Sequence, residues 1–183
     1  MTKKTLIING SPRINGDTAF LIKELREHLH GEIIELSAYR SKIAPCIDCR
    51  ACWKKRGCAI KDDMEIIYND DFDNVILASP IYFMTLPGQV LNIMSRFQPQ
   101  FAAKQFLGDP IILSPKKAGL ILTAGGHGNI SGADHHIRVF FKMLNAGGYE
   151  NHRVISANTD TLPAAQDKEA IQALPDLAKW LEE

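Results

Sequence analysis

Short apolar runs that alternate with stretches of helical periodicity constrain the fold of this chain more than any other feature. Five of these runs predict buried strands, at Thr5–Asn9, Glu32–Leu36, Asn74–Ser79, Ala118–Thr123 and Arg153–Ser156. Apolar residues recur at helical spacing over Asp17–His30, Leu86–Phe106, His135–Asn145 and Ala164–Leu181. Such alternation predicts a doubly wound α/β fold, with a parallel sheet, right-handed crossovers and helices on both faces.

Length and charge limit the architecture and the partners. A chain of 183 residues with 45% hydrophobic content predicts a single domain over residues 1–183, with one insertion at Ile43–Met64. Its 21 basic and 21 acidic residues give no net field to attract nucleic acid or an anionic membrane surface. Because no apolar run approaches membrane-spanning length, we expect a soluble, cytoplasmic protein.

A loop of small residues follows the first predicted strand and leads into the first helix. Ligands of doubly wound sheets bind at the carboxyl ends of strands, and unpaired N–H groups at a helix N-terminus attract anions. Ser11 and Thr18 add hydroxyls there, and Arg13 adds a positive charge. The loop has neither the spacing of a dinucleotide fingerprint nor the ending of a P-loop, so a monophosphate fits better. The alternative is an ordinary turn, with Asp17 capping the helix and Arg13 solvated.

Two further loops lie at the same predicted edge of the sheet. After the third strand, Ser79–Gln89 carries Tyr82 and Phe83, against which a flat ring system could lie; the alternative is that both aromatics cap the core. After the fourth strand, the glycines of Thr123–Asn129 would allow a backbone to approach a ligand closely. We therefore expect the three loops to line one ligand-binding crevice.

Taken together, these loops resemble those of the flavodoxin-like NAD(P)H-dependent FMN reductases. The matching motifs are Gly-Ser-Pro-Arg-x-x-Gly-Asp-Thr, Ser-Pro-Ile-Tyr-Phe with Pro-Gly-Gln behind it, and Thr-x-Gly-Gly, and the likeness extends to about Gly128. The resemblance implies an FMN cofactor and a five-stranded sheet in the order 2-1-3-4-5. It implies that FMN is bound by Ser11, Arg13, Asn15, Asp17, Thr18 and Ala19 at its phosphate, by Pro80, Ile81, Tyr82 and Phe83 beside its ring, and by Thr123, Gly125 and Gly126 at the other edge.

Two positions depart from the family's pattern. Asp17 stands where members often have Asn, and a carboxylate beside a phosphate dianion is repulsive. We therefore expect the side chain of Asp17 to turn away and cap the helix. Ser95-Arg96 stands where the family tends to have Asp-Arg, which leaves the usual salt bridge of Arg96 without its partner.

All four cysteines fall inside one stretch of thirteen residues, with the pattern C-x2-C-x2-C-x5-C at Cys46, Cys49, Cys52 and Cys58. The first three match bacterial ferredoxin spacing, and zinc sites usually separate two C-x2-C knuckles by a longer loop. The stretch, followed by Asp62-Asp63-Met64, also resembles the iron–sulfur flavoproteins, a branch of the same fold that carries a [4Fe–4S] cluster. A cluster, cluster-free thiols as in similar reductases, and zinc all remain open.

The resemblance implies an oxidoreductase in which FMN passes electrons from NAD(P)H to a small acceptor such as a quinone, an aromatic compound or a flavin. The flavin performs this chemistry itself, so we name no catalytic residue. One alternative is an iron–sulfur flavoprotein-type electron-transfer protein with a redox protein partner, and another is a flavin-binding or zinc-stabilised regulatory module. The choice between NADH and NADPH stays open.

Members of this family commonly form homodimers or higher homo-oligomers. The helix predicted after the third strand carries three phenylalanines, Phe97, Phe101 and Phe106, which is more aromatic surface than one crevice needs. They would either be buried or form a face between two subunits.

Overall fold

The computed structural model describes residues 2–183. It contains a parallel sheet, and its strands are β1 (Lys4–Asn9), β2 (Glu32–Ser37), β3 (Asn74–Pro80), β4 (Lys116–Thr123), β5 (Ala146–Gly147) and β6 (Arg153–Ser156). The strand order is β2-β1-β3-β4-β5, and β6 also pairs with β4. The predicted doubly wound, flavodoxin-like fold and its strand order are confirmed.

The last edge of the sheet differs in detail from the prediction. The short strand β5 pairs with the start of β4, at Lys116 and Lys117, and β6 pairs with the end of β4, from Leu120 to Thr123. The two strands therefore occupy successive stretches of the same edge. The predicted fifth strand is β6, and β5 was missed because two residues carry no periodic signal.

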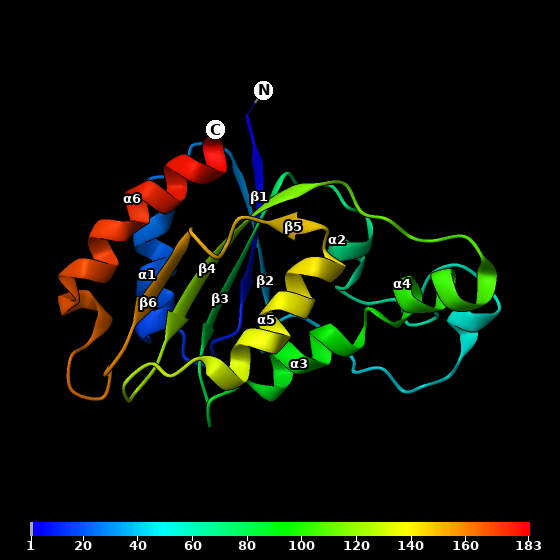
Figure 1. Cartoon of the computed structure of the whole chain (residues 1–183), viewed down its shortest axis with the longest axis horizontal. Coiled ribbons are helices and arrows are strands. Elements are labelled where there is room, and N and C mark those ends of the chain that lie inside the picture. Colours follow the sequence, from blue (N-terminus) through cyan, green and yellow to red (C-terminus); the bar gives the residue numbers. More distant parts are fainter. Residues whose placement is uncertain (1) are drawn as a thin grey trace.

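Helices cover both faces of the sheet (Figure 1). They are α1 (Asp17–Arg26), α2 (Glu65–Tyr68), α3 (Gly88–Ser95), α4 (Gln98–Ala102), α5 (Ser131–Met143) and α6 (Lys168–Glu182). Leu21 of α1 and Leu177 of α6 pack with Ile76 in one core cluster, whereas Val90 of α3 and Ile137 of α5 belong to the other. Strand β3 is buried along its whole length, as expected for a strand with helices on both sides.

The bounds of four helices differ from the sequence prediction. Helix α5 begins at Ser131 rather than His135 and ends at Met143 rather than Asn145. Helix α1 ends at Arg26 rather than His30. The predicted helix over Leu86–Phe106 is three pieces, namely α3, α4 and a π-helical turn at Ala103–Leu107, because Pro99 cannot extend α3 without a clash with the carbonyl of residue 95. The last helix is preceded by a separate 3₁₀ turn, η3 (Ala164–Gln166), and Asp167 caps α6 by accepting a hydrogen bond from the Ala170 N–H.

The segment Ile43–Met64 lies outside the layers of the sheet. Its one regular element is a 3₁₀ turn, η1 (Ala51–Trp53), and together with α4 and the π-helical turn it extends away from the sheet at the right of Figure 1. Among residues 2–183, no helix is long and apolar enough to cross a membrane.

Candidate functional site

The loops after β1, β3 and β4 meet at one edge of the sheet, as the sequence predicted. The strand register brings Asn9 beside Ala78 and Pro80 beside Thr123. The loops are tied to one another by hydrogen bonds from the Gly10 N–H to the Ala78 carbonyl (2.7 Å) and from the Ile81 N–H to the Thr123 carbonyl (2.8 Å). The three loops therefore form one site at the carboxyl ends of the strands, where doubly wound sheets bind their ligands.

The loop after β1 presents the beginning of α1 without a side-chain cap. Gly16 is the N-cap residue, and within residues 2–183 no side chain caps the first turn of the helix. The N–H groups of that turn have no partner within the helix, and the helix dipole is positive there. Arg13 and Asn15 are exposed beside it, while the Ser11 hydroxyl accepts a hydrogen bond from the Arg13 N–H at 3.2 Å. This arrangement suits an anion.

Asp17 does not cap the helix, which corrects the sequence prediction. It is the first residue of α1, and its Oδ1 accepts a hydrogen bond from the Ala164 N–H (2.9 Å), at the start of η3. The carboxylate is thus occupied by a partner 147 residues away in sequence. The expectation that its side chain turns away from the anion site agrees with this contact.

Thr18 and Thr123 join the first and third loops through their side chains. The two hydroxyl oxygens are 2.8 Å apart, and both residues are almost fully buried. Each hydroxyl carries one proton, and one of the two protons is used in this contact. The other hydroxyl keeps its own proton free, so the pair can donate one hydrogen bond to a bound group.

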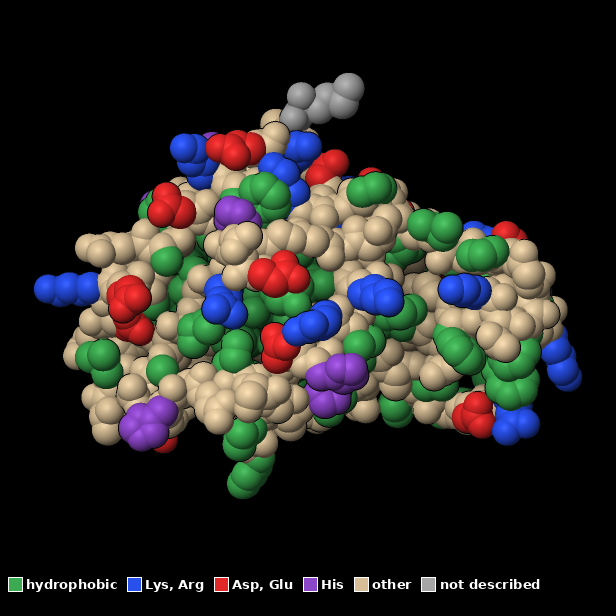
Figure 2. Space-filling model, in the orientation of Figure 1, with side chains coloured by type: hydrophobic (Ala, Val, Ile, Leu, Met, Phe, Trp, Pro, Cys, Tyr) green, Lys and Arg blue, Asp and Glu red, His purple; other side chains and the backbone are tan. Residues whose placement is uncertain are grey.

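The loop after β3 makes a tight, exposed turn. The N–H groups of Tyr82 and Thr85 each donate to the other's carbonyl, and the two corner residues, Phe83 and Met84, have φ angles of 48° and 63°. A positive φ is unfavourable for such side chains and, in folded proteins, is concentrated at functional sites. Phe83 is fully exposed, so it does not cap the core. Figure 2 shows hydrophobic side chains projecting from this edge of the molecule.

A buried polar atom in the same turn has no partner. The Thr85 hydroxyl oxygen is inaccessible and makes no hydrogen bond to any residue in the range 2–183. Exposed aromatic surface, a strained turn and an unpaired hydroxyl together indicate a surface shaped for a bound group. Pro80 and Ile81 lead into this turn directly from β3.

The loop after β4 is held by the segment that follows β6. The Asn158 N–H donates to the Gly126 carbonyl (2.7 Å), and the Thr159 N–H donates to the Ala124 carbonyl (2.9 Å). A side chain at Gly125 would collide with the carboxylate of Asp160, whereas one at Gly126 would meet nothing within 4 Å. The backbone at Gly126 is therefore open to a ligand on one side.

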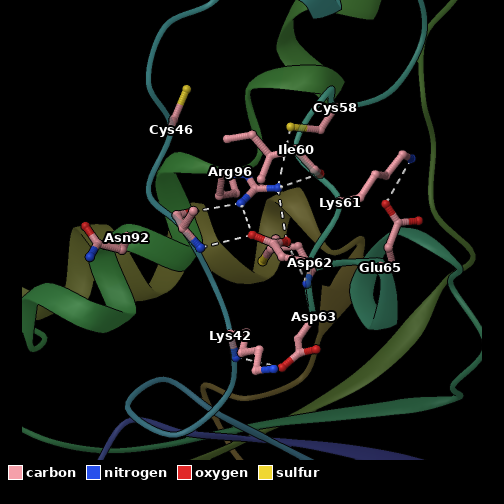
Figure 3. A network of polar contacts seen from close by, with 12 residues as sticks. Lys42, Cys46, Cys58, Ile60, Lys61, Asp62, Asp63, Glu65, Asn92 and Arg96 are labelled. Carbon is pink, nitrogen blue, oxygen red and sulfur yellow. Dashed lines mark hydrogen bonds and ion pairs between the residues drawn. The ribbon is translucent and has the colours of Figure 1, made fainter.

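A buried arginine holds both ends of the cysteine-containing segment against α3 (Figure 3). Arg96 is 1% exposed, and its Nη1 donates to the Asp62 carboxylate (2.6 Å) and to the Ala44 carbonyl (2.7 Å). Its Nη2 donates to the Ile60 carbonyl (3.3 Å) and lies 3.5 Å from the Sγ of Cys58. Arg96 thus keeps a salt bridge, with Asp62 as its partner, although the preceding residue is Ser95.

Two carboxylates at the end of segment 43–64 bind backbone N–H groups at its start. Asp62 also accepts hydrogen bonds from the N–H groups of Ala44 (2.9 Å) and Met64 (3.1 Å), and Asp63 accepts one from the Lys42 N–H (2.7 Å). Burial by itself would raise the pKa of the Asp62 carboxyl, but the hydrogen bonds from Arg96 and the two N–H groups hold it below its usual value. Asp62 is therefore ionised at neutral pH.

All four cysteines line one pocket, together with Trp53 and Arg96. The thiols are free, and burial raises the pKa of the Cys52 thiol, with the other three acting in the same direction. Within residues 2–183, however, no three His, Cys, Asp or Glu side chains converge on one metal position. The residues present, four thiols beside a buried guanidinium whose Nε has no acceptor among residues 2–183, have the chemistry to hold an electron-rich group such as a cluster. Their side chains are not arranged around one metal position.

The three phenylalanines behind β3 divide between core and surface. Phe97 is buried, whereas Phe101 and Phe106 are 54% and 44% exposed. Phe106 stacks on Trp53 with ring centroids 4.2 Å apart, so it anchors the turn between Cys49 and Cys58.

Two contacts that the sequence did not predict, one at Asn9 and one at Ser95, help to shape the site. Asn9, the last residue of β1, accepts a hydrogen bond from the Ser11 N–H (2.9 Å) and so shapes the first loop. Ser95 accepts one from the Cys46 N–H (3.1 Å), which ties the first cysteine to α3. The role of Asn9 could have been expected, because a polar residue at the end of an apolar strand often faces a ligand site. The contact of Ser95 with Cys46 spans 49 residues, and no local sequence pattern indicates it.

A model of the family described as NADPH-dependent FMN reductase matches residues 3–160 of the chain. Two iron–sulfur flavoproteins of Methanocaldococcus jannaschii are 35% and 33% identical to it, over 52% and 79% of this chain. The chain spans about half the length of the first (52%) and 75% of the second. The crystal structure of an FMN-dependent NADH-azoreductase from Bacillus anthracis, in complex with FMN, shares the fold, with a TM-score of 0.71 at 14% identity over the whole of both chains.

Proposed function

The chain belongs to the NADPH-dependent FMN reductase family and is an oxidoreductase, and from that premise we propose that FMN binds at the three-loop edge and carries electrons from NAD(P)H to a small acceptor. Quinones, aromatic compounds and free flavins are acceptors of suitable chemistry. The single observation that carries this proposal is the meeting of an uncapped helix N-terminus, a strained aromatic turn and an open glycine loop at one edge.

The first loop is assigned to the FMN phosphate. The N–H groups at the start of α1, up to Ala19, donate hydrogen bonds to the phosphate, and Ser11, Arg13 and Asn15 surround it. Thr18 reaches the ligand as part of its pair with Thr123, which has one proton to donate. At Asp17 only the backbone takes part, because the carboxylate is held by Ala164.

The other two loops are assigned to the isoalloxazine ring. Residues 80–83 flank one side with apolar surface, and the backbone at Gly125 and Gly126 lies along the other edge. Bound FMN supplies the hydride and electron transfer. The protein binds and orients the flavin, and the exposed aromatic turn limits the access of water to it. No side chain is required as an acid or a base, so none is assigned a catalytic role.

A pair of threonine variants tests this site. Thr18→Val removes the hydroxyl that reaches the ligand and should weaken FMN binding by about 1–3 kcal/mol, measured by fluorescence titration. Thr5→Val is the matched control, because Thr5 is also almost fully buried and accepts one hydrogen bond from Asn74, at the opposite end of β1. Equal FMN affinities for the two variants would contradict the proposed site.

A second candidate function is electron transfer through a [4Fe–4S] cluster on Cys46, Cys49, Cys52 and Cys58, as in an iron–sulfur flavoprotein with a redox protein partner. The observation that favours it is the shared pocket of the four thiols, beside the unpaired Nε of Arg96. Anaerobic purification followed by iron, sulfide and zinc assays tests it. Iron and sulfide in equal amounts support the cluster, zinc alone supports a structural site, and neither supports cluster-free thiols.

The exposed phenylalanines Phe101 and Phe106 are proposed as part of a face between subunits of a homodimer or higher homo-oligomer in the cytoplasm. Sedimentation of the wild type and a Phe101→Ser variant tests this face. A monomeric wild type would contradict it.

A further inference from the structure

The loop after β6, residues 157–163, lies at the same edge of the sheet, although no contact with FMN is assigned to it. The N–H groups of Asn158 and Thr159 donate to carbonyls of the loop after β4 (2.7 and 2.9 Å), so the two loops lie side by side (Figure 1). Just beyond its other end, the Ala164 N–H donates to Asp17 of α1 (2.9 Å). The loop therefore joins the first and third loops of the proposed site.

A tight turn in this loop fixes the position of Asp160. The Asn158 carbonyl accepts hydrogen bonds from the N–H groups of Thr161 (2.9 Å) and Leu162 (2.8 Å). Asn158 has a φ of 57°, a left-handed conformation that asparagine adopts more readily than most residues do. Asp160 lies between these hydrogen-bonded residues, so its backbone is held on both sides.

The carboxylate of Asp160 lies against the Cα of Gly125. A Cβ at Gly125 would be 2.4 Å from Oδ2 of Asp160 and 2.8 Å from Oδ1, so only glycine leaves room for this contact. Gly125 is one of the two glycines assigned to the edge of the isoalloxazine ring. The carboxylate of Asp160 therefore contacts the backbone that borders the proposed ring position.

No cation compensates the charge of this carboxylate in the part of the chain that the structure describes. Asp160 is exposed and, among residues 2–183, forms no ion pair. Asp17 differs, because its carboxylate is occupied by the Ala164 N–H. A group that binds against Gly125 thus meets an unpaired negative charge, and salt screens such a charge only in part within about 10 Å.

We propose that Asp160 sets the midpoint potential of the bound FMN and holds it low. The inference rests on the proposed function, in which NAD(P)H transfers a hydride to the flavin. A hydride carries one proton and two electrons, so the nicotinamide becomes a cation and the uncharged ring system of the flavin gains one negative charge. Asp160 repels that added charge and leaves the oxidised ring almost unaffected. The protein therefore holds reduced FMN less tightly than it would without Asp160, which favours the passage of electrons to an acceptor.

Asp160 acts through its field across the backbone of Gly125 and touches no reacting atom, so it is a positioning residue for charge and not a catalytic one. Asp160→Asn removes the charge and keeps the shape of the side chain, and no hydrogen bond or ion pair of the fold is lost with it. The matched control is Asp176→Asn, another exposed carboxylate without an ion pair, which lies on α6 and outside the loops of the site.

Anaerobic titration of each FMN-loaded variant with dithionite, in the presence of a reference dye of known potential, measures the midpoint potential without turnover. At low salt we expect Asp160→Asn to favour reduced over oxidised FMN about three- to tenfold more than the wild type does. For a two-electron couple this is a rise of about 15–30 mV. Added salt should shrink the rise, because Asp160 is exposed. Asp176→Asn should leave the potential unchanged.

Three results would overturn the inference. One is a potential that does not rise in Asp160→Asn, and another is an equal rise in Asp176→Asn. The third is a rise that salt does not reduce, which would show a changed loop structure in place of a lost charge. A flavin that dithionite reduces but that neither nicotinamide reduces refutes the proposed electron donor, and its potential still tests Asp160. Protein that takes up no FMN refutes the proposed function, and this inference with it.

Discussion

Replacing Arg96 by alanine should release both ends of segment 43–64 from α3. Removing one member of a buried ion pair costs about 3–5 kcal/mol, because the other charge stays buried without its partner. Arg96 is 1% and Asp62 9% exposed at the side chain, so the pair belongs to this class. Asp62 retains the N–H groups of Ala44 and Met64, which offset part of the loss. We therefore expect a loss near the lower limit, about 3 kcal/mol in the free energy of unfolding.

The loss of stability caused by Arg96→Ala should depend on pH, and the titration of Asp62 sets the direction. Its pKa is lower in the folded protein than in the unfolded chain, so its contribution to stability is fully present above the unfolded value of about 4. That contribution is lost as the pH falls through the lower, folded pKa. The difference in stability between wild type and Arg96→Ala should therefore be greatest at pH 7 and shrink below about pH 4.

Urea unfolding followed by circular dichroism measures this difference. Arg138→Ala is the control, because Arg138 forms an exposed ion pair with Asp134 four residues earlier, and exposed pairs of this kind contribute little to stability. Arg96→Lys keeps the charge but not the forked geometry, so it should recover only part of the loss. If Arg96→Ala is no less stable than Arg138→Ala at pH 7, the buried pair of Arg96 and Asp62 does not hold segment 43–64 in place.

Three further substitutions follow from the structure. Asp70→Asn leaves the fully buried amine of Lys116 without its carboxylate and should cost about 3–5 kcal/mol at pH 7 in urea unfolding. Because the hydrogen bonds of Asp70 outweigh burial and lower its pKa, this loss should shrink at about pH 3, and a loss independent of pH would count against the pairing. Gly10→Ala would place a Cβ 2.6 Å from the Ser79 hydroxyl, so a thermal melt should show about 1–3 kcal/mol of destabilisation, and an unchanged melting temperature would contradict the close packing of the first two loops. Phe83→Gly removes a fully exposed side chain at positive φ and should raise stability by about 0.5–1 kcal/mol while weakening FMN binding; unchanged FMN affinity would exclude Phe83 from the site.

The fold was predictable from the sequence because the core strands carry continuous apolar runs. Residues such as Ile7 and Ile76 are fully buried, and the helices between them repeat their apolar residues at a period that the sequence displays directly. The break between α3 and α4 was also visible in principle, since Pro99 stands inside the predicted helix. Strand β5 was not, because a strand of two residues has no period to detect.

The candidate site was predictable only as far as local motifs describe it. The loops after β1, β3 and β4 were located from their glycines, prolines and aromatics. Contacts between residues far apart in the chain are not visible in local motifs. Asp17 binds Ala164 rather than capping its own helix, and Arg96 pairs with Asp62, 34 residues earlier. Sequence patterns indicate which side chains lie near an edge of the sheet. Tertiary packing decides which of those side chains already hydrogen-bond to another part of the protein and which are free to bind a ligand.

The proposed function requires that the three-loop edge binds FMN and that NADPH or NADH reduces the bound flavin there. Anaerobic titration of the FMN-loaded protein with NADPH and with NADH, followed by the visible absorbance of the flavin, is the decisive measurement. We expect purified protein to take up FMN and addition of a reduced nicotinamide to bleach the flavin, with Thr18→Val needing more FMN to load than Thr5→Val. Protein that takes up no FMN, or a bound flavin that neither nicotinamide bleaches, would contradict it.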